Sequence, residues 1–254
     1  MSDERNPQAV GLSQDVILTH CGKLGDFLYS LQIASWFHRT TGRKVHWVLP
    51  TCFNPFNYLT PLLMLQPFTS RVTMTDRHRV QDYGCGGQPY RFDPRNWLNL
   101  SAYERANTPV YNLGFRGYPD KYVAAYYAEE YGLGYDPNFR LTLWEPPPAD
   151  HPYDAFVAGR KTDEVLRSTE GAMAKLVPHA TPMGTHEDLL ALARRMYAAK
   201  EVHTWFCGLA ILCYLANIPV IVHRVPGHAW IPLYYEGDYS KTVTFVEHRQ
   251  EEVA

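Results

Sequence analysis

Near its start the chain reads Val16-Ile-Leu-Thr-His-Cys-Gly-Lys-Leu-Gly-Asp-Phe-Leu-Tyr-Ser-Leu31. Residues 15–20 form an apolar run of strand length, residues 21–26 contain two glycines typical of a turn, and residues 27–40 place apolar side chains at helical spacing. Residues 44–49 then read as a second strand, which Pro50 ends. This order of strand, turn, helix and strand predicts two parallel strands joined by a right-handed crossover.

Similar patterns recur along the whole chain. Helices are predicted at residues 59–65, 120–131, 163–168, 186–200 and 206–216, and strands at residues 71–75, 153–158, 172–177 and 219–223. Prolines concentrate in residues 144–152, where neither a helix nor a central strand can continue. We therefore predict an α/β fold of two Rossmann-like domains, residues 1–145 and a shortened C-terminal domain of residues 153–254, joined by a linker at residues 146–152.

Composition excludes several classes of protein. With 24 Lys and Arg against 26 Asp and Glu, the net charge of −2 lacks the basic excess of bulk nucleic-acid binders. The most apolar stretch, residues 208–222, is too short to span a membrane, and the polar N-terminus lacks the features of a secretory signal. We expect a cytoplasmic protein with no membrane span. Five cysteines without a CxxC pair predict reduced thiols and no metal site.

Aromatic residues make up 14% of the chain, and the tyrosines are numerous between residues 83 and 135, where arginines are interleaved with them. This combination favours binding of a glycan or a nucleic-acid strand by stacking and charge. The alternative is that the tyrosines fill the interior of a loop-rich region.

The turn with two glycines lies at the carboxyl end of the first predicted strand, the edge where open α/β sheets bind ligands. Gly22 and Gly25 allow close backbone approach, and the N–H groups of the following helix favour an anion or a polar substrate group. The spacing matches neither GxGxxG nor a Walker loop. Asp26 has two interpretations, because a carboxylate there either stabilises the first helical turn or serves as a catalytic group.

Residues 16–31, with the helix and strand after them, resemble the N-terminal motif of the heptosyltransferase family, in which the turn ends in Leu/Met-Gly-Asp. Cys207-Gly-Leu209, the apolar helix after it and Ile218-Pro-Val-Ile-Val222 are similar to the donor-binding stretch of that family. The resemblance implies a glycosyltransferase of the GT-B fold, with Asp26 as general base. The sequence contains no Asp-x-Asp triplet, which fits metal-independent transfer with a nucleotide-sugar as co-substrate and no further cofactor.

We expect the donor and its phosphates near Gly22, Gly25, Arg160, Lys161, His203, Thr204, Cys207 and Gly208. We expect the acceptor near His20, Lys23, Tyr111 and Arg116. Phe206 stands where the family has an aspartate. The C-terminal domain is also short for a GT-B enzyme, so the donor is not assumed to be ADP-heptose. The acceptor is expected to be a glycan or a hydroxymethylated base in DNA, as in phage DNA glycosyltransferases. The alternative function is a non-catalytic nucleotide or nucleotide-sugar binding module.

Overall fold

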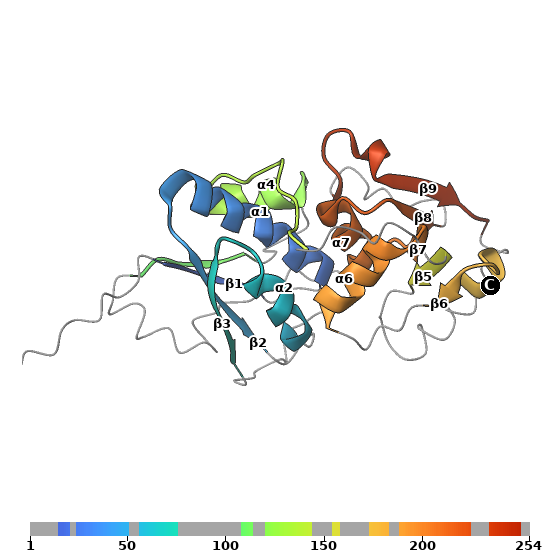
Figure 1. Cartoon of the computed structure of the whole chain (residues 1–254). Helices are drawn as coiled ribbons and strands as arrows, with labels where there is room; N and C mark the ends of the chain where they lie inside the picture. Colours follow the sequence, from blue (N-terminus) through green and yellow to red (C-terminus); the bar gives the residue numbers. More distant parts are fainter. Residues whose placement is uncertain are drawn as a thin grey trace, which may run out of the picture.

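The computed structural model describes residues 15–20, 24–50, 56–75, 108–113, 120–143, 154–157, 173–182, 188–224 and 234–249. Within these residues the chain forms two parallel β-sheets, one in each half of the sequence. Helices from both halves meet between the two sheets (Figure 1). The predicted α/β class with parallel sheets is therefore confirmed.

The N-terminal sheet has the strand order β3-β2-β1-β4, and all its neighbouring strands are parallel. Its strands are β1 (Val16–Thr19), β2 (Val45–Pro50), β3 (Thr69–Thr75) and β4 (Val110–Asn112). Its helices are α1 (Leu24–Thr41), η1 (Phe56–Leu59), α2 (Thr60–Met64) and α4 (Val123–Glu130). Strand β1 is flanked by β2 and β4 and is buried along its whole length, as its apolar run predicts. The predicted strand-helix-strand unit is formed by β1, α1 and β2.

The C-terminal sheet has the order β6-β5-β7-β8-β9, again with parallel neighbours. Its strands are β5 (Asp154–Val157), β6 (Thr181–Pro182), β7 (Glu201–Trp205), β8 (Val220–Arg224) and β9 (Val243–Glu247). Its helices are α6 (Leu189–Ala198), α7 (Gly208–Ala216) and the short η3 (Tyr239–Lys241). The pattern analysis did not predict β4, β6, β7 or β9, because each is short or mixes polar residues into its apolar positions.

One predicted strand is wrong. Residues 172–177 were expected to be extended, but residues 173–176 form a helical turn, closed by a 2.8 Å hydrogen bond from the Val177 N–H to the Met173 carbonyl. The reason is composition, because Ala, Met, Lys and Leu favour helix and only Val177 favours strand. The start of α6 also differs, since Asp188 is the N-cap and its side chain accepts from the Ala191 N–H at 2.9 Å.

Helix α7 is apolar on every side, and all its residues from Leu209 to Ala216 are buried. A helix of this kind needs partners all round. It packs against α1 on one side and against α6 and β8 on others, so the large hydrophobic core contains residues of both halves. The helix ends at Asn217, whose left-handed φ of 56° lets its N–H bond the Tyr214 carbonyl.

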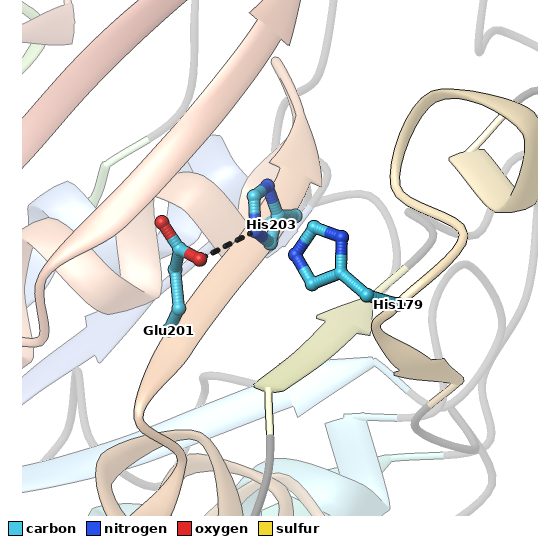
Figure 2. Close-up of side chains that lie close together, drawn as sticks. All are labelled: His179, Glu201 and His203. Carbon is cyan, nitrogen blue, oxygen red and sulfur yellow. Dashed lines mark ion pairs between the residues drawn. The ribbon is translucent and has the colours of Figure 1, made fainter.

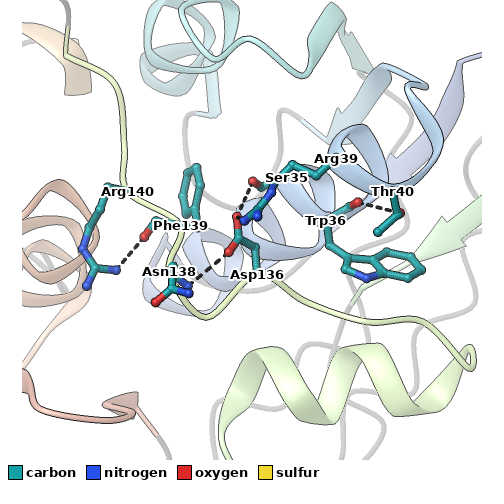
Figure 3. A network of polar contacts seen from close by, with 8 residues as sticks. All are labelled: Ser35, Trp36, Arg39, Thr40, Asp136, Asn138, Phe139 and Arg140. Carbon is teal, nitrogen blue, oxygen red and sulfur yellow. Dashed lines mark hydrogen bonds and ion pairs between the residues drawn. The ribbon is translucent and has the colours of Figure 1, made fainter.

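The segment after α4 contacts α1 through a set of polar contacts around Asp136 (Figure 3). Asp136 accepts a 2.9 Å hydrogen bond from the Ser35 hydroxyl of α1 and pairs with Arg39 at 2.8 Å. Further along, the Leu141 N–H donates to the Leu215 carbonyl of α7 at 2.7 Å. This segment therefore ties the C-terminal part of α1 to the end of α7.

The carboxyl group of Asp136 has an altered pKa. Burial raises its pKa, but the hydrogen bonds from Arg39 and Ser35 and the charge of Arg39 outweigh burial, so the pKa lies below the usual value. A depressed carboxyl pKa stabilises the fold above the unfolded-state pKa, and that stabilisation is lost as the pH falls through the folded-state value.

The predicted domain boundary at residues 146–152 lies outside the described residues, and the division into domains stays a prediction. Among the residues that the structure describes, none belongs to a helix with the length and apolar character needed to cross a membrane.

Asp136→Asn is expected to lower the free energy of unfolding at pH 7 by about 1.5 kcal/mol, the lower end for hydrogen bonds to charged groups, because Arg39 is largely exposed. The difference from the parent chain should shrink as the pH falls from the unfolded-state pKa through the lower folded-state pKa of Asp136, because below both values the carboxyl group is protonated in both states. Urea unfolding at several pH values measures it, with Asp120→Asn as control, because Asp120 is 79% exposed. Equal loss in both variants would contradict this role.

Candidate active site at two helix N-termini

The first turns of α1 and α7 touch backbone to backbone at Gly25 and Gly208. A Cβ atom on Gly208 would lie only 2.8 Å from the Gly25 nitrogen and 3.2 Å from Leu24 Cβ. A Cβ atom on Gly25 would lie 3.2 Å from the Gly208 Cα. Only glycine fits this contact without a shift of the backbone. The partial positive ends of two helices are thereby brought to one place, which favours an anion.

Asp26 lies next to this contact, in the first turn of α1, and is 9% exposed. A carboxylate in a first helical turn is favoured by the helix dipole. The backbone of the same turn is held from α4, because the Tyr127 hydroxyl donates to the Asp26 carbonyl at 3.3 Å. Both interpretations of Asp26 from the sequence are compatible with this position.

His20 supports the same turn from the end of β1. Its Nε2 lies 3.1 Å from the Tyr127 hydroxyl, and its ring packs edge-on against Phe27 and Tyr127. Since the single phenolic proton goes to the Asp26 carbonyl, Nε2 of His20 carries a proton and donates to the tyrosine oxygen. Burial lowers the pKa of His20 to about 3, so the imidazole is neutral at pH 7. The structure thus places His20 behind Asp26, inside the core.

The start of α7 is arranged differently. Cys207 is the N-cap in an extended conformation, and within the described residues its side chain makes no capping hydrogen bond. Its sulfur lies 3.4 Å from the hydroxyl of Thr204, which is fully buried. A helix start without a side-chain cap can offer its first N–H groups to an anion. Thr204, Cys207 and Gly208, all expected near the donor, are brought together here.

Phe206, at the position where the heptosyltransferase family has an aspartate, packs against aromatic rings. Its ring lies edge-on to Tyr234 with centroids 5.4 Å apart and 6.1 Å from the ring of Tyr235. The Phe206 ring therefore belongs to a cluster of aromatic rings beside the start of α7.

His203 lies on the other face of the C-terminal sheet. Alternate residues of a strand point to opposite faces. On β7, Thr204 therefore shares a face with Val202, which belongs to the core around α7. His203 shares the opposite face with Trp205. Trp205 packs on a separate small core of Met173, Val177 and Ala180. The structure therefore does not bring His203 to the start of α7.

The buried face around His203 contains a chain of imidazoles. Nδ1 of His203 lies 3.0 Å from Nε2 of His223, and Nδ1 of His223 lies 2.7 Å from Nε2 of His248. Burial, together with the neighbouring His203 and His248, lowers the pKa of His223 to about 4, so His223 is neutral at pH 7.

The remaining predicted site residues divide into two groups. Tyr111 of β4 is half-buried, and its ring packs against Phe37 and Tyr131 with centroids 5.3 Å and 5.4 Å apart. Five residues lie outside the described residues: Gly22, Lys23, Arg116, Arg160 and Lys161.

No protein-family model matches the sequence, and no curated protein matches it by sequence. Solved structures do match. A glycosyl transferase family 9 protein from Veillonella parvula DSM 2008 matches with a TM-score of 0.59 over 93% of this chain and 87% of its own, at 13% identity.

Two further matches are enzymes of E. coli. The heptosyltransferase WaaC with ADP matches with a TM-score of 0.57 over 94% of this chain and 95% of its own, at 14% identity. The ADP-heptose lps heptosyltransferase II matches with a TM-score of 0.58 over 94% of this chain and 92% of its own, at 12% identity. The chain has the GT-B fold of these glycosyltransferases. At such low identity the match establishes the fold, and it confirms the fold that the resemblance of residues 16–31 implies.

Within this GT-B fold, sequence reasoning missed one residue that shapes the site. Tyr127 lies within the helix predicted at residues 120–131 and within the tyrosine-rich residues 83–135, yet it contacts both the Asp26 carbonyl and His20. Tyr127 is 101 residues from Asp26, so no local pattern could have shown the contact.

Gly208→Ala is expected to lower the free energy of unfolding by about 1–3 kcal/mol, since the added Cβ meets the Gly25 backbone. The sign is decisive. Where a helix glycine has no such contact, its replacement by alanine raises the free energy of unfolding by about 0.5–1 kcal/mol. Chemical unfolding measures the change, and unchanged or increased stability would show that the two GT-B helix starts do not touch.

Proposed function

We propose that the chain is a glycosyltransferase that moves a sugar from a nucleotide-sugar donor to a hydroxyl acceptor, with Asp26 as general base. The observation that carries the proposal is the position of Asp26 in the first turn of α1, beside the contact between the starts of α1 and α7. The carboxylate that would accept the proton of the acceptor hydroxyl thus lies beside the two helix N-termini that would bind the leaving diphosphate. The fold shared with solved glycosyltransferases supports the same reaction class.

The reaction needs both parts. The acceptor oxygen forms a bond to the anomeric carbon of the donor while the bond from that carbon to the diphosphate oxygen breaks. The electron pair of the broken bond leaves on the nucleoside diphosphate. The Asp26 carboxylate takes the proton of the acceptor hydroxyl, so the nucleophile does not have to form a free alkoxide. The charge on the departing diphosphate is stabilised by helix N–H groups.

The donor is a co-substrate in this proposal, and transfer is metal-independent with no other cofactor. The first N–H groups of α7, after Cys207 and Gly208, contact the diphosphate, and Gly25 contributes its close backbone. Arg160 and Lys161, which follow β5 in the sequence, add positive charge. Phe206, packed on Tyr234, presents an aromatic surface. This surface favours a donor group with a flat or apolar face over a polar group that would hydrogen-bond to an aspartate.

The acceptor is a glycan or a hydroxymethylated base in DNA, and we place the reaction in the cytoplasm. The two E. coli neighbours are heptosyltransferases, one with ADP and one named for ADP-heptose. ADP-heptose is therefore one candidate donor for this chain among the nucleotide-sugars. Some tyrosines of residues 83–135 are structural, because Tyr122 and Tyr127 are buried in the core. This leaves a smaller number for stacking on an acceptor.

A non-catalytic nucleotide-sugar binding module is the second candidate. It is favoured by Phe206, since an enzyme that loses a donor contact can keep the fold and the helix N-termini. The two candidates differ in what Asp26 does, because only an enzyme needs its proton acceptance.

Asp26→Asn is expected to keep donor binding and to lower the turnover of the donor by about 10²–10⁴-fold, the range for loss of a general base. Turnover is measured as release of nucleoside diphosphate in the presence of acceptor. Asp120→Asn is the control, since Asp120 is exposed and distant in sequence. A rate unchanged by Asp26→Asn would exclude Asp26 as the base, and a parent chain that binds donor without turnover would favour the binding module.

A nucleotide-sugar is expected to raise the melting temperature. A ligand at 100 times its dissociation constant stabilises the folded chain by about 2.7 kcal/mol. ADP-, UDP-, GDP- and CMP-sugars are compared in a thermal-shift measurement, with the same free sugars as controls. Stabilisation by one nucleotide series identifies the donor class. If none of the four series raises the melting temperature above its free sugar, both the enzyme and the binding module are wrong.

A further inference from the structure

Three metal-ligating side chains converge on the face of the C-terminal sheet that points away from α7. They are His179, in the turn before β6, and Glu201 and His203, both on β7 (Figure 2). One nitrogen of each imidazole and one oxygen of the carboxylate lie within 4.8 Å of one another. Glu201 and His203 are two positions apart on one strand, so they share a face, and the ring of His179 points toward His203.

The buried nitrogen of His203 is the strongest sign of a ligand. Nε2 of His203 has no hydrogen-bond partner among the described residues, and the His203 side chain is only 7% exposed. A carboxylate oxygen of Glu201 lies 3.3 Å from Nε2 of His203, but the angle between the two groups does not fit a hydrogen bond. A buried polar atom without a partner is costly, so such an atom calls for an explanation.

The order of protons along the imidazole chain gives a reason for this geometry. If His203 donates through Nδ1 to His223, and His223 donates in turn to His248, Nε2 of His203 has a lone pair. Two electron-rich atoms, this nitrogen and the Glu201 oxygen, then face each other. A cation between them removes the repulsion. A ligating imidazole whose other nitrogen donates to a fixed acceptor is the usual arrangement at metal sites.

We propose that His179, Glu201 and His203 form a binding site for a zinc-like divalent cation, with the fourth position open to water. Two imidazoles and one carboxylate are a donor set typical of zinc with an open position. Ligands about 2.0–2.1 Å from a tetrahedral ion are about 3.3 Å apart. The His203 to Glu201 distance already has this value. His179 is exposed, so its ring can turn to the ion without disturbing the core.

The position of the site indicates a structural role. Glu201 begins β7, whereas α7 starts after the other end of that strand, so the cation and the proposed donor diphosphate lie toward opposite ends of β7. The segment with His179 is held on the sheet by a small core of Met173, Val177 and Ala180. A cation bound by both His179 and β7 would hold this segment on the sheet, where only a few apolar contacts hold it otherwise. The inference is independent of the proposed function.

The test is a titration of the full-length chain, freed of metal by a chelator, with Co²⁺ and then Zn²⁺. We expect one Co²⁺ per chain with the visible absorption of a site of fewer than six ligands, and its displacement by Zn²⁺. Zn²⁺ should also raise the melting temperature. His179→Ala and Glu201→Gln should each weaken Co²⁺ binding by at least about tenfold, and His179→Ala should remove the thermal shift.

The matched control is His38→Ala, which removes another partly exposed histidine at the end of α1 and leaves the three ligands intact. It should bind Co²⁺ like the parent chain. Because His179 is exposed, its variant is expected to fold, and an unchanged melting temperature without metal checks this. Absence of stoichiometric Co²⁺ binding by the parent chain, or equal binding by His179→Ala and His38→Ala, would overturn the proposal.

Discussion

The contact between Gly25 and Gly208 is the constraint on which the rest of the structure depends. Two helices can meet through their first turns only where neither position has a Cβ atom. This contact sets α1 of one half against α7 of the other. Helix α7, apolar on every side, then finds partners all round, and one hydrophobic core forms from both sheets.

The same contact explains where the proposed site lies. Helix starts are sites of partial positive charge, and two of them converge beside the carboxylate of Asp26. Behind them, a buried Tyr127 and a neutral His20 fix the backbone of the first turn of α1. The site is therefore rigid on the N-terminal side. On the C-terminal side, the ring of Phe206 packs on Tyr234 beside the start of α7.

The C-terminal sheet places the two proposed sites on opposite faces. Side chains alternate along β7, so Thr204 faces the start of α7 while His203 faces the opposite side with Glu201. The segment before β6, which the sequence suggested to be a strand, turns as a helix and places His179 over that second face. The adjacent residues His203 and Thr204, which look equivalent in the sequence, thus lie on opposite faces of the sheet.

Local order and fold class were determined by the sequence alone. The apolar run at residues 16–19, the glycine turn and the helical spacing after it predict a parallel strand-helix-strand unit, because these patterns act over a few residues. The Gly-Asp turn likewise predicts a ligand site at the start of α1. The tertiary structure alone decided that Gly25 meets Gly208, that Tyr127 reaches Asp26 and that His179 joins Glu201 and His203. These contacts join residues far apart in the chain, and no local periodicity encodes which helix or strand packs against which.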